Sequence, residues 1–159
     1  MRLLALTCFS KWANSLSMVA RYSADSLAEF LKRRKIATRE ELEAVLANPA
    51  RATFFRKIGR LEYLSSYSHR GMYYTLKSVA QFSPVGLWEC KSVWFSRFGN
   101  LLDTAEAFVQ RAEAGYSAAE LAAILHVKTK HALGQLFHDG RLQREKIGRS
   151  YVYLSVEDD

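Results

Sequence analysis

Two stretches of the chain place hydrophobic and polar residues in the same order. The first, "TREELEAVL", begins at Thr38 and the second, "SAAELAAIL", begins at Ser117, so their numbers differ by 117 − 38 = 79. At this offset Leu42 corresponds to Leu121, and both stretches carry apolar residues at i, i+3 and i+4. This spacing is typical of a short amphipathic helix, and its recurrence indicates an internal repeat.

Both helices begin with the same capping signal. Thr38 is followed three residues later by Glu41, and Ser117 by Glu120. In such a capping box the hydroxyl accepts a hydrogen bond from the amide of the glutamate, and the carboxylate accepts one from the amide of the capping residue. We therefore expect a helix to start at each of these two positions.

Further helices flank this one in each copy. An amphipathic helix is predicted before it, over 25–35 in the first copy and from 101 to an end at Gly115 in the second. After a short break, a third helix is predicted over 50–60 and over 129–139. Its buried stripe is expected to consist of Phe54, Ile58 and Leu61 in the first copy and of Leu133, Leu136 and Phe137 in the second.

Each copy ends in a predicted β-hairpin. The phrases "YSHRGMYYTL" and "EKIGRSYVYLS" contain Arg70 and Arg149, whose numbers again differ by 149 − 70 = 79. The "GRL" segments at 59–61 and 140–142 instead differ by 140 − 59 = 81. We therefore expect one helix or hairpin to differ slightly in length between the copies.

This order of elements, with a short turn between the second and third helices and a terminal hairpin, resembles the winged helix-turn-helix superfamily. The resemblance implies an α+β, mostly helical protein with two tandem winged helix-turn-helix modules joined by an aromatic-rich connector. The expected segments are an N-terminal tail (1–22), a first module (23–77), the connector (78–99) and a second module (100–156). Residues 1–17 are expected to be dispensable, or Met18 to be the true start.

In that superfamily the third helix usually enters the DNA major groove, and the hairpin, or wing, approaches the backbone or the minor groove. The resemblance therefore implies DNA contacts from each third helix and each wing. In the first module these residues are Arg51, Thr53, Arg56, Lys57 and Arg60 on the helix, and Ser66, His69 and Arg70 on the wing. In the second module they are Lys128, Lys130, His131, Gln135 and His138 on the helix, and Lys146 and Arg149 on the wing.

The charge of the chain favours a polyanionic partner. The 159 residues include 23 Lys+Arg and 16 Asp+Glu, a formal net charge of +7. Residues 126–149 contain six Lys+Arg and two acidic residues, a local charge of 6 − 2 = +4 on the side expected to face DNA. Nucleic acid is the expected partner of such a surface.

Other chemistry finds little support in the sequence. Cys8 and Cys90 are far apart and form no C-x-x-C pair, which favours a reduced, cytoplasmic protein in which Cys90 is a small buried residue. Because no catalytic motif is present, we expect neither an enzyme nor a cofactor. His126, His131 and His138 have no acidic or cysteine partner at ligand spacing, so no metal site is expected. No apolar run approaches the length of a membrane span.

The connector is rich in aromatic residues and poor in Gly and Ser, unlike a flexible linker. Trp88, Trp94 and Phe95 are expected to pack between the two modules. An alternative role for the Trp88/Trp94 segment is an exposed patch that recruits a protein partner.

The sequence therefore predicts a protein that binds double-stranded DNA as a transcriptional regulator. Two alternatives stay open at this point. One is a DNA-end-recognition component of a mobile element, and the other is a winged-helix protein–protein adaptor that does not bind DNA.

Overall fold

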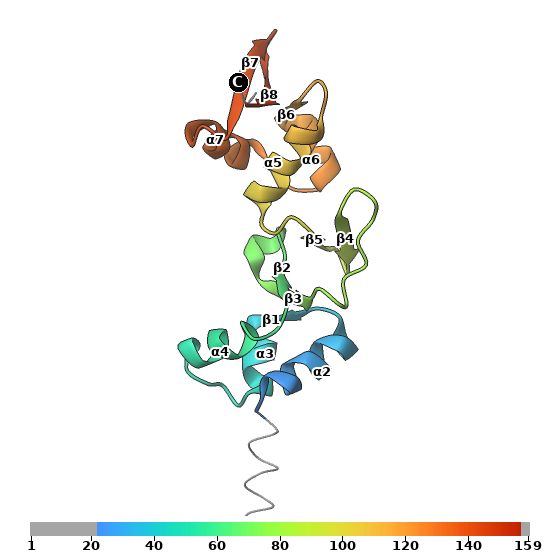
Figure 1. The fold of residues 1–159 in the computed structure, drawn as a ribbon, viewed down its shortest axis with the longest axis vertical. Helices are drawn as coiled ribbons and strands as arrows, with labels where there is room; N and C mark the ends of the chain where they lie inside the picture. Colours follow the sequence, from blue (N-terminus) through green and yellow to red (C-terminus); the bar gives the residue numbers. More distant parts are fainter. Residues whose placement is uncertain (1–21, 157–159) are drawn as a thin grey trace, which may run out of the picture. The chain divides into compact units, whose positions relative to one another are not determined.

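The computed structural model of the protein describes residues 22–156. The expectations for Cys8, Met18 and the tail before Tyr22 therefore lie outside the described residues. The described chain has an α+β fold, with six α-helices and small antiparallel sheets (Figure 1). It divides into two compact units, the first formed by residues up to 65 together with 72–81, and the second by 66–71 together with 82 onwards.

The first unit packs three helices on a three-stranded sheet. Its elements are α2 (Ala24–Arg34), β1 (Ala37–Thr38), α3 (Arg39–Val45), α4 (Arg51–Ile58), β2 (Tyr63–Ser65) and β3 (Tyr73–Leu76). The last strand, β3, lies between β1 and β2 and is antiparallel to both. The buried core consists of Leu27, Leu31, Ala37, Leu42, Leu46, Phe54, Ile58, Tyr74 and Leu76.

The second unit has the same order of elements, preceded by an additional hairpin. It contains the 3₁₀ turn η1 (His69–Gly71), β4 (Leu87–Cys90), β5 (Val93–Ser96), α5 (Leu101–Arg111), β6 (Tyr116–Ser117), α6 (Ala118–Leu125), α7 (Lys130–His138), β7 (Leu142–Ile147) and β8 (Ser150–Ser155). Strands β4 and β5 form one hairpin, and β8 lies between β6 and β7. The buried core consists of Tyr67, Leu87, Ala105, Val109, Leu121, Leu125, Leu133, Leu136, Leu142 and Tyr153.

Strand pairing follows the offset seen in the sequence. Ala37 pairs with Tyr74 in the first unit, and Tyr116 pairs with Tyr153 in the second. The residue numbers of both partners differ by the same amount between the units, since 116 − 37 = 79 and 153 − 74 = 79. The two sheets therefore have the same register, which places Tyr74 and Tyr153 at equivalent buried positions.

The expected shift of the offset at the two "GRL" segments does not extend into the strands. Tyr63 pairs with Leu76 and Leu142 with Ser155, so β2 and β7 also correspond at 142 − 63 = 79. Helix α7 has nine residues where α4 has eight. The turn before the strand takes up this difference, and the register of the sheet is kept.

Equivalent positions are also buried alike. Phe54 and Leu133 are both fully buried, as are Leu42 and Leu121, which confirms the predicted inward faces of these helices. The predicted capping boxes are both formed. In the second, the Glu120 carboxylate accepts hydrogen bonds from the Ser117 amide and hydroxyl, each over 2.8 Å, and these bonds lower the pKa of Glu120.

The expectation that Gly115 ends the first helix of the second copy is wrong. Helix α5 ends at Arg111, four residues earlier, and Gly115 lies in the loop before β6 with a φ of 69°. A Cβ atom at Gly115 would collide with the main-chain carbonyl of Tyr153. The glycine is required here by the close approach of strand β8 and by its positive φ.

The aromatic connector forms the β4–β5 hairpin of the second unit. Phe95 is fully buried and its ring centroid lies 5.3 Å from that of Trp88, while Trp94 is half-buried against the core of this unit. Cys90, expected to be buried, is partly exposed at the end of β4. The aromatic residues of this segment are thus part of one folded unit and do not form a separate linker.

Residues 66–71 connect β2 to β3 but belong to the second unit. Ser66, Tyr67 and Ser68 are buried there. The Tyr67 amide donates to the Trp94 carbonyl over 3.1 Å, and the Trp94 amide donates to the Ser68 hydroxyl over 2.8 Å. The segment predicted as the wing of the first module is therefore packed into the β4–β5 hairpin.

Candidate nucleic-acid interface

The turn between α6 and α7 is held by a buried threonine. Thr129, which directly precedes α7, is 1% exposed and its hydroxyl donates to the carbonyl of Ala118 at the start of α6 over 2.7 Å. The carbonyl of Thr129 accepts a hydrogen bond from the amide of Leu133 over 2.9 Å. These bonds connect the start of α6 to the start of α7, so the direction of α7 is fixed by the core of the unit.

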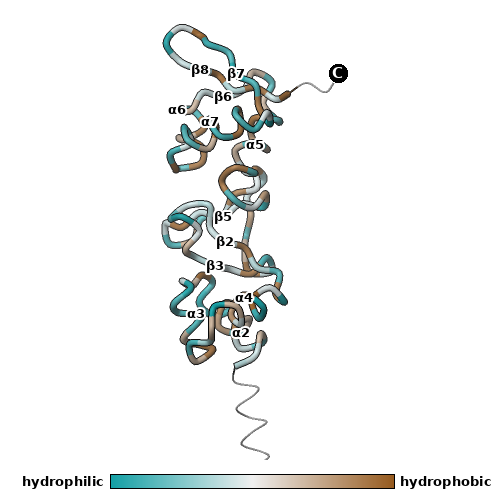
Figure 2. Tube along the Cα trace, turned by 90° about the vertical axis from the view of Figure 1, so that its left-hand side faces the viewer, coloured by the Kyte–Doolittle hydropathy of each residue, from teal (hydrophilic) through white to brown (hydrophobic). Residues whose placement is uncertain are grey.

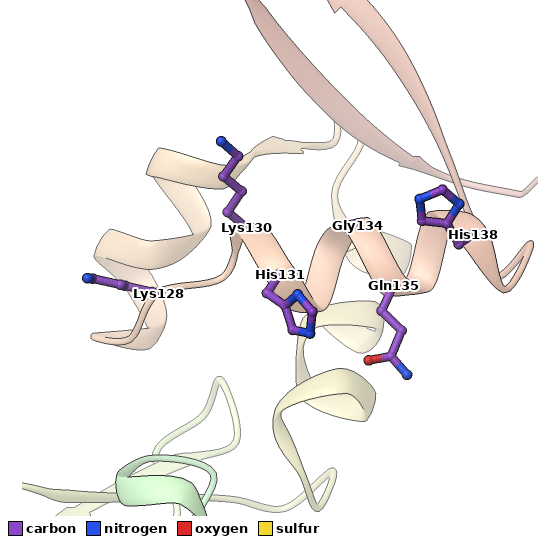
Figure 3. A pocket seen from close by; sticks show the side chains of 6 residues that line it. All are labelled: Lys128, Lys130, His131, Gly134, Gln135 and His138. Atoms are coloured by element: carbon purple, nitrogen blue, oxygen red, sulfur yellow. The ribbon is translucent and has the colours of Figure 1, made fainter.

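Helix α7 has one apolar and one polar face. Ala132, Leu133 and Leu136 are buried against the core. The opposite face borders an open hollow of about 700 Å³ (Figure 3). The hollow is lined by Lys128, Lys130, His131, Gly134, Gln135 and His138, and the sequence predicted five of these six as contacts, all except Gly134. Since no acidic residue lines it, the surface suits an anionic partner.

The β7–β8 hairpin presents two further predicted contacts. Lys146 and Arg149 are exposed, Lys146 opposite Tyr151 and Arg149 in the turn that follows Gly148. Figure 2 shows hydrophilic residues along most of this hairpin, with a short hydrophobic stretch near its end. Ile147, the last residue of β7, is 60% exposed. The hairpin thus exposes positive charge on both sides of one apolar residue.

Arg144 connects the hairpin to α7. Its guanidinium carbon lies 4.1 Å from the ring centroid of Phe137 on α7 and 4.4 Å from that of Tyr151 on β8. A cation between two aromatic rings is attracted to both faces. This contact orients the hairpin relative to α7. Arg144 is one of the six basic residues counted in residues 126–149, and its guanidinium is held between the two rings.

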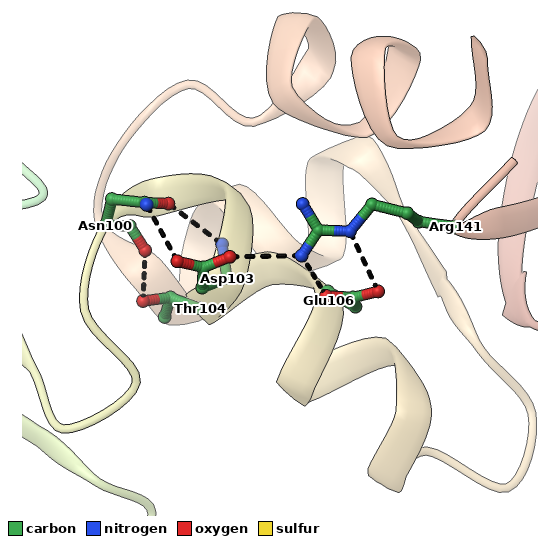
Figure 4. A network of polar contacts seen from close by, with 5 residues as sticks. All are labelled: Asn100, Asp103, Thr104, Glu106 and Arg141. Carbon is green, nitrogen blue, oxygen red and sulfur yellow. Dashed lines mark hydrogen bonds and ion pairs between the residues drawn. The ribbon is translucent and has the colours of Figure 1, made fainter. Parts of the chain in front are cut away.

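A second arginine of this region is neutralised by acidic partners (Figure 4). Arg141 donates to Asp103 over 3.0 Å and from its Nε to Glu106 over 3.1 Å, both on α5. These hydrogen bonds, chiefly those to Glu106, raise the pKa of the Arg141 guanidinium. Asn100 caps the same helix by accepting from the Asp103 amide over 3.0 Å. Arg141 therefore positions the start of β7, and its charge is not free to bind a partner.

The first unit offers a different basic surface. Arg51, Arg56 and Arg60 are exposed on or just after α4, whereas Thr53 and Lys57 are half-buried. Lys57 donates to the main-chain carbonyl of Tyr22 and therefore points toward the start of α2.

An exposed aromatic ring lies among these arginines. Phe55 is 37% exposed, and the guanidinium carbons of Arg39 and Arg51 lie 5.5 and 5.6 Å from its centroid. Phe55 and the guanidinium groups of Arg39 and Arg51 thus form one patch, in which the two cations lie against the aromatic ring.

Two of the three predicted wing contacts of the first module lie in the 3₁₀ turn η1, whereas the third, Ser66, is buried and the prediction of a DNA contact there is wrong. His69 and Arg70 are exposed, both with positive φ (51° and 56°), and His69 Nδ1 is 2.9 Å from the Ser68 hydroxyl. The segment belongs to the second unit, so these two side chains are not carried by a free hairpin next to α4. Tyr67 was the available signal, because a bulky aromatic ring at the expected hairpin tip indicates packing.

The histidines of the second unit are separated by their environments. The His126 ring stacks on Trp94 at a centroid distance of 4.3 Å and an interplanar angle of 15°, while His131 and His138 lie on the exposed face of α7. Within residues 22–156, no three His, Cys, Asp or Glu side chains come close enough together to hold a metal ion.

Over the same range, none of the helices combines the length and apolar character needed to traverse a bilayer.

Comparison with known proteins supplies no relative of this chain. No protein-family model matches it, and no curated protein or solved structure is significantly similar to it. The geometry of α7 and of the β7–β8 hairpin is therefore the basis for inferring a function.

Proposed function

We propose that the protein binds double-stranded DNA and acts as a transcriptional regulator, with α7 and the β7–β8 hairpin of the second unit as its main contact surface. The observation that carries this proposal is the exposed face of α7, where five polar or basic side chains surround a hollow without an acidic residue. An α-helix fits the major groove of B-DNA, where lysine can bind guanine and glutamine can bind adenine. Lys130 and Gln135 are the side chains to which we assign base contacts.

The arrangement of elements supports the same reading. A helix pair joined by a short turn, followed by a hairpin whose last strand lies between the other two strands, is expected of a winged helix-turn-helix module. We propose that each unit is such a module. The second carries an extended wing with Lys146 and Arg149 exposed, and these side chains would bind phosphates beside the groove.

In this proposal the first unit contributes affinity through α4. Arg51, Arg56 and Arg60 are exposed and can neutralise phosphates, whereas Lys57 is engaged by the Tyr22 carbonyl. Because residues 66–71 are part of the second unit, the first module would bind without a wing of its own. His69 and Arg70 would then contribute only through the surface of the second unit.

Selection of binding sites from random DNA duplexes, followed by fluorescence anisotropy on the selected duplex, tests the proposal. We expect one enriched sequence and a log K that falls by about 0.9 per log unit of salt for each phosphate contact. Lys130→Ala together with Gln135→Ala should abolish the preference for this sequence. Lys77→Ala is the control, because Lys77 is exposed and directly follows β3, outside the surfaces assigned to DNA.

The outcome of this experiment separates the other functions. Binding that depends on a free duplex end, with no preference for an internal sequence, would support recognition of DNA ends. A folded protein that binds no duplex at low salt would contradict the proposal and favour a protein–protein adaptor. A salt-independent affinity would likewise contradict it, because phosphate contacts release counterions.

A further inference from the structure

Gly134 lies in the middle of α7, four residues after its first residue and four before its last. Glycine is a poor helix former, because its backbone loses more conformational freedom than that of any other residue when it is fixed. A glycine at such a position is usually explained either by a φ that other residues avoid or by a neighbour that leaves no room for a side chain. Neither explanation applies to Gly134.

Space is available for a side chain at this position. A Cβ atom added to Gly134 would meet no atom of the surrounding protein within 4 Å. At Gly86, by contrast, a Cβ would lie 2.9 Å from side-chain atoms of Arg97 and Phe98. Gly134 is also absent from the residues with positive φ, which include Gly86 and Gly140. The fold of the described residues therefore does not require a glycine at 134.

Gly134 instead lines the hollow on the exposed face of α7 and contributes no side chain to fill it. Figure 3 shows it at the centre of the helix, with Lys130 and His131 toward one end and Gln135 and His138 toward the other. All four of these side chains can donate hydrogen bonds. The bare backbone thus lies at the centre of the surface to which we assign DNA contacts.

The first unit has a different residue at the equivalent position. By the offset that relates the two sheets, Phe55 of α4 is equivalent in position to Gly134 of α7, since 134 − 55 = 79. Phe55 projects from α4 between Arg39 and Arg51 and is 37% exposed. The two helices therefore present opposite shapes at one position, a protruding ring on α4 and a recess on α7.

We propose that Gly134 is the position of closest approach between α7 and DNA and that it determines sequence specificity. This inference rests on the proposed DNA-binding function. A base-pair edge on the floor of the major groove enters the recess, which brings Lys130 and Gln135 within hydrogen-bonding distance of the neighbouring bases. Helix α4, with Phe55 in the equivalent place, cannot approach as closely and binds the phosphate backbone. The second unit reads the sequence, and the first adds affinity that is independent of sequence.

The test is a series of substitutions of increasing size in the full chain: Gly134→Ala, Gly134→Ser and Gly134→Phe. Alanine should raise the melting temperature by about 2–4 °C, because it favours the helix and meets no neighbour. The same change should weaken binding to the selected duplex about tenfold or more, with a larger loss for phenylalanine. Affinity for a duplex of unrelated sequence should stay within about twofold, because phosphate contacts are unchanged.

A matched control places the same ring elsewhere. Ala44→Phe adds a phenylalanine ring at an exposed position of α3 in the first unit. This variant should bind the selected duplex and the unrelated duplex as the wild type does. If Gly134→Ala binds the selected duplex as tightly as the wild type does, the inference is overturned while DNA binding stands. A lower melting temperature of Gly134→Ala would show that packing requires the glycine, which also overturns it. If the wild type binds no duplex, the inference falls together with the proposed function.

Discussion

Tyr67 donates a hydrogen bond from its buried hydroxyl to the main-chain carbonyl of Leu125 over 3.0 Å, although 58 residues separate the two in sequence. Leu125 is the last residue of α6, where a helix leaves carbonyls without an intrahelical partner. The Tyr67 side chain thus supplies a hydrogen-bond donor to a main-chain carbonyl at the C-terminal end of α6. This bond fixes the turn from which α7 departs.

Replacing Tyr67 by phenylalanine should destabilise the second unit by about 1–3 kcal/mol, because it leaves the buried carbonyl of Leu125 without a donor. Urea unfolding followed by circular dichroism measures this change. Tyr151→Phe is the control, since Tyr151 is 43% exposed and its ring keeps the contact with Arg144. Equal stability of Tyr67→Phe and the wild type would mean that water replaces the tyrosine as donor.

Stability at alkaline pH should report the same hydroxyl. Burial raises the pKa of Tyr67 above its ordinary value of 10.0, so the folded state holds this proton more tightly than the unfolded state does. The contribution of Tyr67 to the free energy of unfolding is complete below pH 10 and decreases as pH rises further. The difference in stability between wild type and Tyr67→Phe should therefore shrink above pH 10. A constant difference between pH 8 and pH 11 would contradict this assignment.

The equivalent core positions of the two units should respond alike to truncation. Phe54→Ala and Leu133→Ala should each lower the free energy of unfolding by about 2–5 kcal/mol, because both side chains are fully buried. Phe55→Ala on the same turn of α4 serves as the control and should have a smaller effect, since Phe55 is partly exposed. Thermal melts near that of the wild type for both core variants would contradict the assigned helix faces.

Two arginines of the second unit should differ in their effect on DNA binding, although their charges are the same. Arg149→Ala should weaken binding and lower the slope of log K against log salt by about 0.9, because the exposed Arg149 is assigned to a phosphate. Arg141→Ala should leave the slope unchanged, because Asp103 and Glu106 already neutralise Arg141. Anisotropy titrations at several salt concentrations compare the two variants. If both variants lowered the slope of log K against log salt by the same amount, Asp103 and Glu106 would not neutralise Arg141 as assigned.

The sequence was sufficient to predict those features that depend on short-range pattern. The capping boxes at Thr38 and Ser117 and the inward faces marked by Phe54 and Leu133 need only helical periodicity and local hydrogen bonds, and the structure confirms them. The polar face of α7 follows from the same periodicity. Its use in DNA binding stays a prediction.

Features that depend on distant segments were not predictable in this way. Gly115 carries a normal helix-ending signal, but the approach of Tyr153, from a strand near the end of the chain, decides its role. The destination of the 66–71 segment likewise depends on Trp94 and Leu125, which no local pattern connects to Tyr67. The recess at Gly134 likewise depends on which atoms surround the glycine in space, and helical periodicity does not contain that information.

The placement of residues 66–71 also affects how this protein can be divided and how it is made. Both ends of the segment are joined to strands of the first sheet, while Tyr67 contributes to the second core. A fragment starting at residue 82 would lack that ring, and a fragment ending at 81 would carry it with no core to receive it. On the ribosome, Tyr67 emerges before any of residues 82–156, so its burial has to wait for the C-terminal half to be synthesised. The two compact units are therefore not separable folding units, although their sheets share one register.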